Sequence, residues 1–223
     1  MTRRTHFVPA ALALAILLFV LGCGITIGPG VVGSGVVKTE SRSTGEFTSV
    51  QNNISANVDI TVGPATQIVV EGDDNILPLI TTDVHNGVLV ISSNASIQTR
   101  SALKVTITTP ELRGLVINGS GDASIRGLSG GSFDGAINGS GNVTATGKVD
   151  KLIGRINGSG NLDFDELTAD SAAIAIAGSG RACVAATSSL DASITGSGDI
   201  AYRPASELNL RKQIVGSGSI RPI

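Results

Sequence analysis

The chain has 223 residues, a formal net charge of −2, only 3% aromatic residues and 2 histidines. This length suits one domain, and the scarcity of rings predicts a thin core of small aliphatic side chains. A nucleic-acid-binding domain normally carries a basic face, so the acidic balance argues against that class. The few histidines leave little imidazole for proton transfer or metal binding.

Residues 1–22 have the three parts of an export signal. Arg3 and Arg4 supply the positive end, 7–21 are apolar, and Gly22 is the small residue before Cys23. The apolar stretch is shorter than the roughly 20 residues of a membrane-spanning helix. We therefore expect a bacterial lipoprotein signal that is cleaved before Cys23, so that a diacylated Cys23 tethers the protein to a membrane. An uncleaved anchor and ordinary secretion are the alternatives.

Residues 23–36 are rich in glycine, and we expect a flexible linker there. Gly28 to Gly33 match the dinucleotide-binding pattern G-x-G-x-x-G, but they follow a signal peptide and no helical pattern comes after them. The stretch GNVTATGKV (141–149) resembles a phosphate-binding loop, but its spacing is wrong and Val149 stands where Ser or Thr is required. Neither motif predicts a cofactor, and we expect none.

The tripeptide GSG recurs along the second half of the chain at intervals of about 20 residues, beginning at Gly119, Gly139, Gly158, Gly178, Gly196 and Gly216. A period of this length is typical of a solenoid. An isoleucine stands two residues before every one of these tripeptides, at Ile117, Ile137, Ile156, Ile176, Ile194 and Ile214. The apolar positions all lie at even offsets from the glycine, which is the period of a strand.

A unit of this length fits short strands joined by tight corners better than a helix with its connections. Stacked coils would lie about 4.8 Å apart and hydrogen-bond to one another, so the isoleucines would form one buried column. Glycine tolerates the positive φ and close backbone approach of a sharp, repeated turn. We therefore interpret GSG as the corner of an all-β, parallel β-helix-like solenoid, with Pro222 blocking further pairing at its C-terminal end.

The region before the repeats alternates apolar and polar residues and predicts further strands. Asn86-Gly87 indicates a hairpin turn and makes His85 a loop residue rather than a catalyst. The acidic stretch 71–75 could attract calcium, although a solvated loop is the favoured interpretation. Cys183 has no partner for a disulfide once Cys23 is lipidated, and we expect no metal site.

The order of these segments resembles the head GIN domain family, described as auto-transporter adhesins. The resemblance rests on GEFTSVQNNISANVDITVGPATQIVVEGDDNILPLITTDVHNGVLVI (45–91), VTITTPELRGLVINGSGDASI (105–125) and the repeated INGSG, and it covers roughly 37–223. It implies a right-handed parallel β-helix on the outside of bacterial cells, without established catalytic or binding residues. We expect one domain over 37–223, with regular coils from about residue 113.

Two polar columns flank the predicted corner and form a candidate binding face for a glycan or an envelope protein. Stacked amides could equally hydrogen-bond along the stack and only stabilise it. The columns contain Asn118, Asn138 and Asn157 on one side of GSG, and Asp122, Asn142, Asn161 and Asp199 on the other.

A polysaccharide-active enzyme on the same fold is the main alternative, and a purely structural envelope component is another. Such an enzyme would use Asp163 and Asp165, which leave one strand on the same side. The alignment of coils brings no Lys, Arg or His against them, so a solvated acidic face is favoured. We expect a lipid-anchored, non-catalytic protein of the bacterial cell envelope, without nucleic-acid partners and of undecided oligomeric state.

Overall fold

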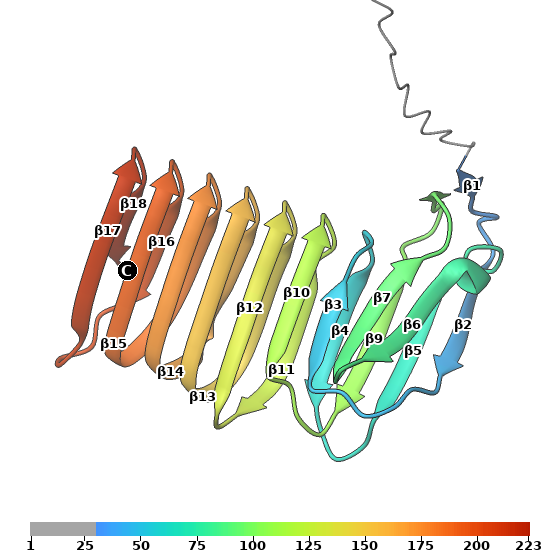
Figure 1. Cartoon of the computed structure of the whole chain (residues 1–223), viewed down its shortest axis with the longest axis horizontal. Helices are drawn as coiled ribbons and strands as arrows, with labels where there is room; N and C mark the ends of the chain where they lie inside the picture. The colour runs from blue at the N-terminus through green and yellow to red at the C-terminus, as the bar shows by residue number, and fades with distance from the viewer. Residues whose placement is uncertain (1–29) are drawn as a thin grey trace, which may run out of the picture.

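A computed structural model describes residues 30–223 as one elongated stack of strands (Figure 1). The predicted leader 1–22 and the predicted lipidation residue Cys23 lie outside the described residues. Within 30–223, no helix has the length and apolar character needed to cross a membrane. The all-β, parallel solenoid predicted from the repeats is confirmed.

The strands follow one another along the whole described chain, with a single short 3₁₀ helix, η1, among them. Their bounds are β1 Val31–Val32, β2 Val37–Arg42, β3 Ser49–Asn52, β4 Asn57–Val62, β5 Gln67–Asp73, η1 Leu77–Leu79, β6 Ile80–His85, β7 Val88–Ser93, β8 Ile97–Gln98, β9 Lys104–Thr109, β10 Gly114–Gly119, β11 Ala123–Ser129, β12 Ser132–Gly139, β13 Asn142–Gly158, β14 Asn161–Gly178, β15 Arg181–Gly196, β16 Asp199–Arg203, β17 Asn209–Gly216 and β18 Ser219–Pro222.

Each coil supplies one strand to each of two faces that enclose the core. One face runs β6, β7, β3, β10 and β12, continues through the later parts of β13, β14 and β15, and ends at β17. The other runs β2, β5, β9, β4 and β11, continues through the earlier parts of β13, β14 and β15, and ends at β16 and β18. Pairing is parallel except that β5 runs antiparallel between β2 and β9, and β6 and β7 form an antiparallel hairpin.

The repeat sets the register as predicted. Ile117 pairs with Ile137, and the column continues in the same register to Ile214. All its members are buried except Ile214, which is 42% exposed because no further coil covers it. Burial of each isoleucine contributes about 1.5–3 kcal/mol relative to exposure, so a slip of one residue would turn this whole column toward solvent.

Gly158 and Gly160 show why the corner requires both glycines. Gly158 has φ +134°, a conformation that side chains disfavour, and a Cβ there would lie 2.3 Å from the carbonyl oxygen of Gly139 in the preceding coil. A Cβ on Gly160 would lie 2.4 Å from the carbonyl oxygen of Gly141. The corners of adjacent coils therefore touch through their backbones, and the GSG tripeptide is a structural corner.

The core is thin, as the composition predicted, and its two phenylalanine rings pack against a glycine. Phe133 and Phe164 meet edge to face, with centroids 6.2 Å apart. A Cβ on Gly135 would lie 3.1–3.2 Å from both rings. The absence of a side chain at Gly135 thus leaves room for both rings between the two faces.

Coils without GSG precede the regular GSG coils, which were predicted from about residue 113. Strands β3 and β4 form a coil in register with β10 and β11, and β7 and β9 form another beyond it. Asn52 stands in the isoleucine column opposite Ile117, and its buried amide donates to the Ala56 carbonyl at 2.8 Å. Because this amide holds a corner that lacks GSG, the repeat pattern did not reveal the coil.

Residues 30–36 of the predicted flexible linker 23–36 make regular contacts with the domain. Val31 and Val32 form β1 and pair in parallel with β8, and the Gly33 N–H donates to the Gln98 carbonyl at 2.7 Å. Gly33 is buried, and a Cβ there would clash with Asp73. The dinucleotide-like glycines therefore end in a close backbone contact, and β2 follows them instead of a helix.

Candidate interaction surface

The GSG corners line up as a ridge along one long edge of the solenoid, at the arrowheads of the coils in Figure 1. Each corner presents one serine, and all of these serines are exposed. Among residues 30–223, none of their hydroxyl groups makes a hydrogen bond to the protein. The ridge consists of Ser120, Ser140, Ser159, Ser179, Ser197 and Ser217 with their flanking glycines.

One side of the ridge carries an amide ladder. Nδ2 of Asn157 donates to Oδ1 of Asn138 at 2.9 Å, and Nδ2 of Asn138 donates to Oδ1 of Asn118 at 2.8 Å. Asn118 in turn donates to Oδ1 of Asn53 at 2.7 Å. The structure thus brings the three predicted asparagines together and adds Asn53, which sequence reasoning missed because its coil has no GSG. We call this row the asparagine ladder.

The second polar column lies on the other side of the ridge. Asn161 donates to Oδ1 of Asn142 at 2.6 Å, and Asn142 donates to Oδ1 of Asp122 at 2.8 Å. Arg181 then interrupts the column. Asp199 follows it and accepts a hydrogen bond from the Ser219 hydroxyl at 2.5 Å, and this bond holds the pKa of Asp199 below its ordinary value.

These hydrogen bonds bear on whether the polar columns form a binding face or only stabilise the stack. The amides do hydrogen-bond along the stack, so they stabilise it. A carboxamide has two N–H donors and two acceptor lone pairs, however, and Asn118, Asn138 and Asn142 each use only one donor and one acceptor. Asn138, Asn157, Asn142 and Asn161 are all exposed. Every rung therefore keeps hydrogen-bonding capacity that faces solvent, at about the 4.8 Å spacing of the coils.

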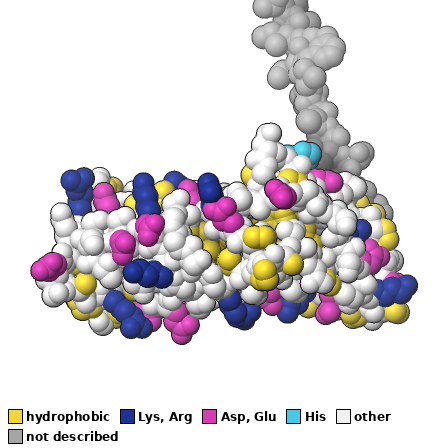
Figure 2. Space-filling model, turned by 90° about the horizontal axis from the view of Figure 1, so that it is seen from below, with side chains coloured by type: hydrophobic (Ala, Val, Ile, Leu, Met, Phe, Trp, Pro, Cys, Tyr) yellow, Lys and Arg dark blue, Asp and Glu magenta, His cyan; other side chains and the backbone are white. Residues whose placement is uncertain are grey.

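Charges are mixed rather than clustered. Figure 2 shows the side opposite the corners, where Lys and Arg side chains alternate with Asp and Glu and leave no area of one sign. Within the part of the chain that the structure describes, no group of His, Cys, Asp and Glu is placed to hold a metal ion. The side opposite the corners therefore offers no extended patch of one charge.

The prediction that no cation lies against Asp165 is wrong. Arg203 forms two hydrogen bonds with its carboxylate, with the Nε bond at 2.6 Å. Three residues are inserted between the paired positions Phe164 and Thr168 of β14, so the simple coil alignment fails here. The Arg203 guanidinium holds the pKa of Asp165 below its ordinary value, and burial raises the pKa of the neighbouring Cys183 thiol. Neither group suits proton transfer near neutral pH.

The acidic stretch 71–75 is not a solvated loop, because 71–73 belong to β5 and Asp73 is fully buried. Its carboxylate accepts hydrogen bonds from the backbone N–H groups of Gly35 at 2.9 Å, Arg100 at 2.8 Å and Ser101 at 3.2 Å. Burial opposes its ionisation, but the Arg100 and Ser101 bonds outweigh this and lower the pKa of Asp73. Asp73 thus binds the start of the domain to the loop after β8.

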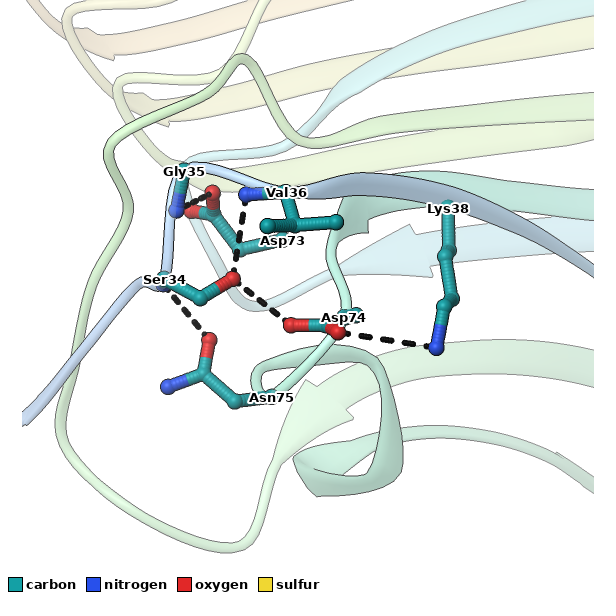
Figure 3. A network of polar contacts seen from close by, with 7 residues as sticks. All are labelled: Ser34, Gly35, Val36, Lys38, Asp73, Asp74 and Asn75. Carbon is teal, nitrogen blue, oxygen red and sulfur yellow. Dashed lines mark hydrogen bonds and ion pairs between the residues drawn. The ribbon is translucent and has the colours of Figure 1, made fainter.

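The two residues after Asp73 complete this contact (Figure 3). The Ser34 hydroxyl donates to Asp74 at 2.6 Å, and the Ser34 N–H donates to Asn75 at 2.8 Å. Asn75 also donates to the Val32 carbonyl at 2.8 Å. We call the contacts of Asp73, Asp74 and Asn75 with 32–35 the N-terminal clasp.

The structure also places the predicted hairpin turn, His85 and the stretch that resembles a phosphate-binding loop. Asn86 and Gly87 have φ of +52° and +77° and form the predicted hairpin turn. His85 is the last residue of β6 and pairs with Val88, so it ends a strand rather than lying in the loop. Lys148, in the stretch like a phosphate-binding loop, lies within β13 and pairs with Thr168.

The fold and its surface define a class of protein, a rigid β-solenoid with a repeated polar edge. Residues 46–204 match the model of a family described as "Putative auto-transporter adhesin, head GIN domain". The match covers more than half of the chain, so the chain belongs to this family. The resemblance seen in the sequence is confirmed.

Solved structures share the fold. A protein named "putative adhesin" from Bacteroides fragilis NCTC 9343 is 25% identical and superimposes with a TM-score of 0.69 over 87% of this chain and 100% of that one. A "putative lipid binding protein" from Parabacteroides distasonis ATCC 8503 is 25% identical, with a TM-score of 0.58 over 86% and 99%. A "putative adhesin" from Parabacteroides merdae ATCC 43184 is 19% identical, with a TM-score of 0.58 over 86% and 98%, and shows the fold alone. No curated protein matches the chain. The family and the first of these structures support an adhesin-like protein of the cell surface or envelope.

Proposed function

We propose that this protein is an exported, lipid-anchored adhesion module of the bacterial envelope, which binds a partner along its serine ridge and does not catalyse a reaction. The observation that carries the proposal is the pair of polar columns, whose amides keep unused hydrogen-bonding groups on the three coils that carry Asn118, Asn138 and Asn157. Regular, preorganised hydrogen-bonding groups suit a ligand that is itself repetitive, since binding then costs little ordering of the protein.

The position of the N-terminus supports the anchored arrangement. The clasp fixes residues 32–35 at one end of the solenoid. From Cys23 to Gly30 the chain can span about 25 Å when fully extended. A lipid on Cys23 would therefore keep the β1 end close to the membrane. The ridge would run from that end toward the C-terminal coils.

The enzyme alternative loses support from its best candidate. A general acid needs a pKa near the working pH, and Arg203 lowers that of Asp165. Asp163 is exposed, and it pairs with Thr144 in the preceding coil and with Cys183 in the following coil. The arrangement favours a structural ion pair between coils over an acid and base pair.

The proposal is tested by electrophoresis of the full chain, in mild detergent, through native gels cast with different envelope polysaccharides. We expect retardation in at least one polysaccharide, without loss of polymer when the gel is stained. A variant with Asn118, Asn138 and Asn157 all changed to Thr should lose the retardation while remaining folded. The matched control changes Ser132, Lys151 and Ser171, an equally aligned column at the opposite corner, to Thr.

The outcomes separate the candidate functions. Retardation that survives the ladder variant contradicts a binding ridge, and so does an absence of retardation in every polymer. Clearing of the polymer would overturn the non-catalytic proposal and direct attention to Asp163 and Asp165. Because the ladder variant loses three side-chain hydrogen bonds worth about 0.5–1.5 kcal/mol each, a thermal melt must accompany the gels.

A further inference from the structure

A cavity of about 450 Å³ opens at the N-terminal end of the asparagine ladder. Hydroxyl groups and aliphatic side chains line it together, and Asn53 belongs to both the cavity and the ladder. No charged residue contributes to it. The lining includes Asn53, Ile54, Ser55, Ile97, Thr99 and Leu103. Its volume falls within the range of about 300–1,000 Å³ found for small-molecule sites.

Asn53 lines this cavity, and its side chain has a fixed orientation and unused donors. Its Oδ1 accepts from Asn118 at 2.7 Å and from Gln51 at 2.9 Å, so both lone pairs of the oxygen are occupied. Its Nδ2 group makes no hydrogen bond to any of residues 30–223. The side chain is exposed. The amide therefore cannot exchange its two ends without losing two bonds, and it presents two N–H donors.

The ladder strengthens those donors. Each Nδ2 donates toward the N-terminal neighbour, from Asn157 to Asn138, to Asn118 and finally to Asn53. Amide dipoles aligned in one direction polarise each other. The free N–H groups of Asn53 are the donor end of that chain, whereas the free Oδ1 of Asn157 is its acceptor end. The strongest neutral donor of the ladder is thus located at the cavity.

We propose that this cavity is the terminal subsite for a neutral glycan whose following sugar units lie along the asparagine ladder. Asn53 donates to a hydroxyl or carbonyl oxygen of the last sugar, and the aliphatic side chains Ile54, Ile97 and Leu103 contact its apolar C–H face. This inference rests on the proposed function of the ridge and adds a ligand class and a direction of binding.

The chemistry of the lining selects this class. The nine lining residues carry no charge, so nothing in the cavity compensates a phosphate or carboxylate, and burying such a charge unpaired is costly. The hydroxyls of Ser55 and Thr99 make no hydrogen bond to residues 30–223, and both residues are exposed, so these groups remain free for a polyhydroxylated ligand. A fatty acyl chain would leave these groups and the Asn53 donors without partners.

The test measures binding of short neutral oligosaccharides of glucose, mannose, galactose and N-acetylglucosamine to the full chain in detergent micelles, by calorimetry. Asn53→Asp keeps the shape and both acceptor interactions but removes the donors, and Ser55→Leu fills the opening. Asn209→Asp and Ser188→Leu make the same changes at exposed sites outside the cavity. Loss of a hydrogen bond worth about 1.4 kcal/mol corresponds to tenfold in affinity.

We expect both cavity variants to weaken binding of at least one oligosaccharide about tenfold, with both controls unchanged and all melts equal. If the ladder variant abolishes retardation by a polysaccharide but the cavity variants bind normally, the cavity proposal is overturned and the proposed ridge function stands. If no carbohydrate binds at all, both fall. Preferential binding of acidic oligosaccharides or of phospholipid vesicles would also overturn the neutral-glycan assignment.

Discussion

The two ends of the solenoid close in different ways (Figure 1). At the N-terminal end, antiparallel strands and η1 cover the core, with Leu77 fully buried. At the C-terminal end a single coil remains uncovered, and Ile214, Val215 and Ile223 are 42–60% exposed. Irregular segments thus form a lid over the N-terminal end, whereas the C-terminal end is the last repeated coil with no lid.

Both ends nevertheless place charge where another coil would have to pack. On the N-terminal edge strand β2, Glu40 and Arg42 stand opposite the buried Val70 and Ile68 and pair with each other at 2.7 Å. On the C-terminal edge strand β17, Lys212 stands opposite buried Ala192. Inward-pointing charge on an edge strand opposes edge-to-edge association.

Lys212 closes the open end with a single side chain. Its Nζ donates to the Ile220 carbonyl at 2.9 Å and lies 5.0 Å from the ring centroid of Tyr202. Pro222 in β18 removes a donor from the other free edge, as the sequence predicted. The comparison shows that a solenoid can end without a separate cap when its last coil carries one inward cation and a proline.

The largest effect should come from breaking the stack that joins the two ends. Gly158→Ala places a Cβ 2.3 Å from the Gly139 carbonyl oxygen at φ +134°, so we expect a loss of about 2–6 kcal/mol in the free energy of unfolding from strain and overpacking. Gly130→Ala is the control, because Gly130 also has a positive φ of +64° but a Cβ there would have no atom within 4 Å. This variant should lose about 1–2 kcal/mol in the free energy of unfolding. Equal losses in urea titrations would contradict backbone contact between corners.

The next effect concerns the N-terminal lid alone. Asp73→Asn replaces an acceptor oxygen with an amide group facing backbone N–H donors, so the clasp should open. Hydrogen exchange of the Val31 and Gly33 amides should accelerate about tenfold or more, because charge-assisted hydrogen bonds are lost. Asp74→Asn, at a half-buried site, should change exchange much less. Unchanged exchange in Asp73→Asn would show that β1 is held without the carboxylate.

The C-terminal end should respond to loss of its inward charge. Lys212→Leu leaves an apolar coil edge next to exposed Ile214, so we expect concentration-dependent self-association in sedimentation velocity. The control Arg211→Leu removes an outward-facing charge from the neighbouring position and should leave the sedimentation profile unchanged. Equal association of both variants would indicate a general effect of lost charge rather than an opened core.

The smallest predicted effect is the pH dependence of the clasp. The pKa of Asp73 and that of Asp74 are lowered below the ordinary 3.8. A lowered pKa in the folded state stabilises the clasp above the ordinary value, and this stabilisation is lost as pH falls through the folded pKa. Exchange at Val31 should therefore be flat from neutral pH to about pH 4, once corrected for intrinsic rates, and should rise in stronger acid. Opening of the clasp as pH rises would contradict this.

The repeated coils were predictable because their contacts repeat in the sequence. Ile117 and Ile137 pair as their spacing indicated, and Asn138 bonds to Asn118 as the column suggested. The N-terminal coils were missed because Asn52 fills the corner with its own amide instead of GSG. A single buried asparagine has no period, so no repeat analysis could detect it.

The contacts around Asp73 and Asp165 were unpredictable for a different reason. Asp73 meets Gly35 and Arg100, which are distant in sequence and belong to no repeat. Arg203 reaches Asp165 only because three inserted residues shift β14 against β15. Local irregularities of this kind change which side chains meet, although the coil period itself is unaffected.

The most direct test of a binding ridge is hydrogen–deuterium exchange of the full chain with and without a polysaccharide that retards it. Slower exchange should appear at the three GSG corners beside the asparagine ladder, at 119–121, 139–141 and 158–160, and at 53–55, with β17 and β18 unchanged. Protection confined to β17 and β18 would contradict the account, because it would place the partner at the open C-terminal end rather than along the asparagine ladder.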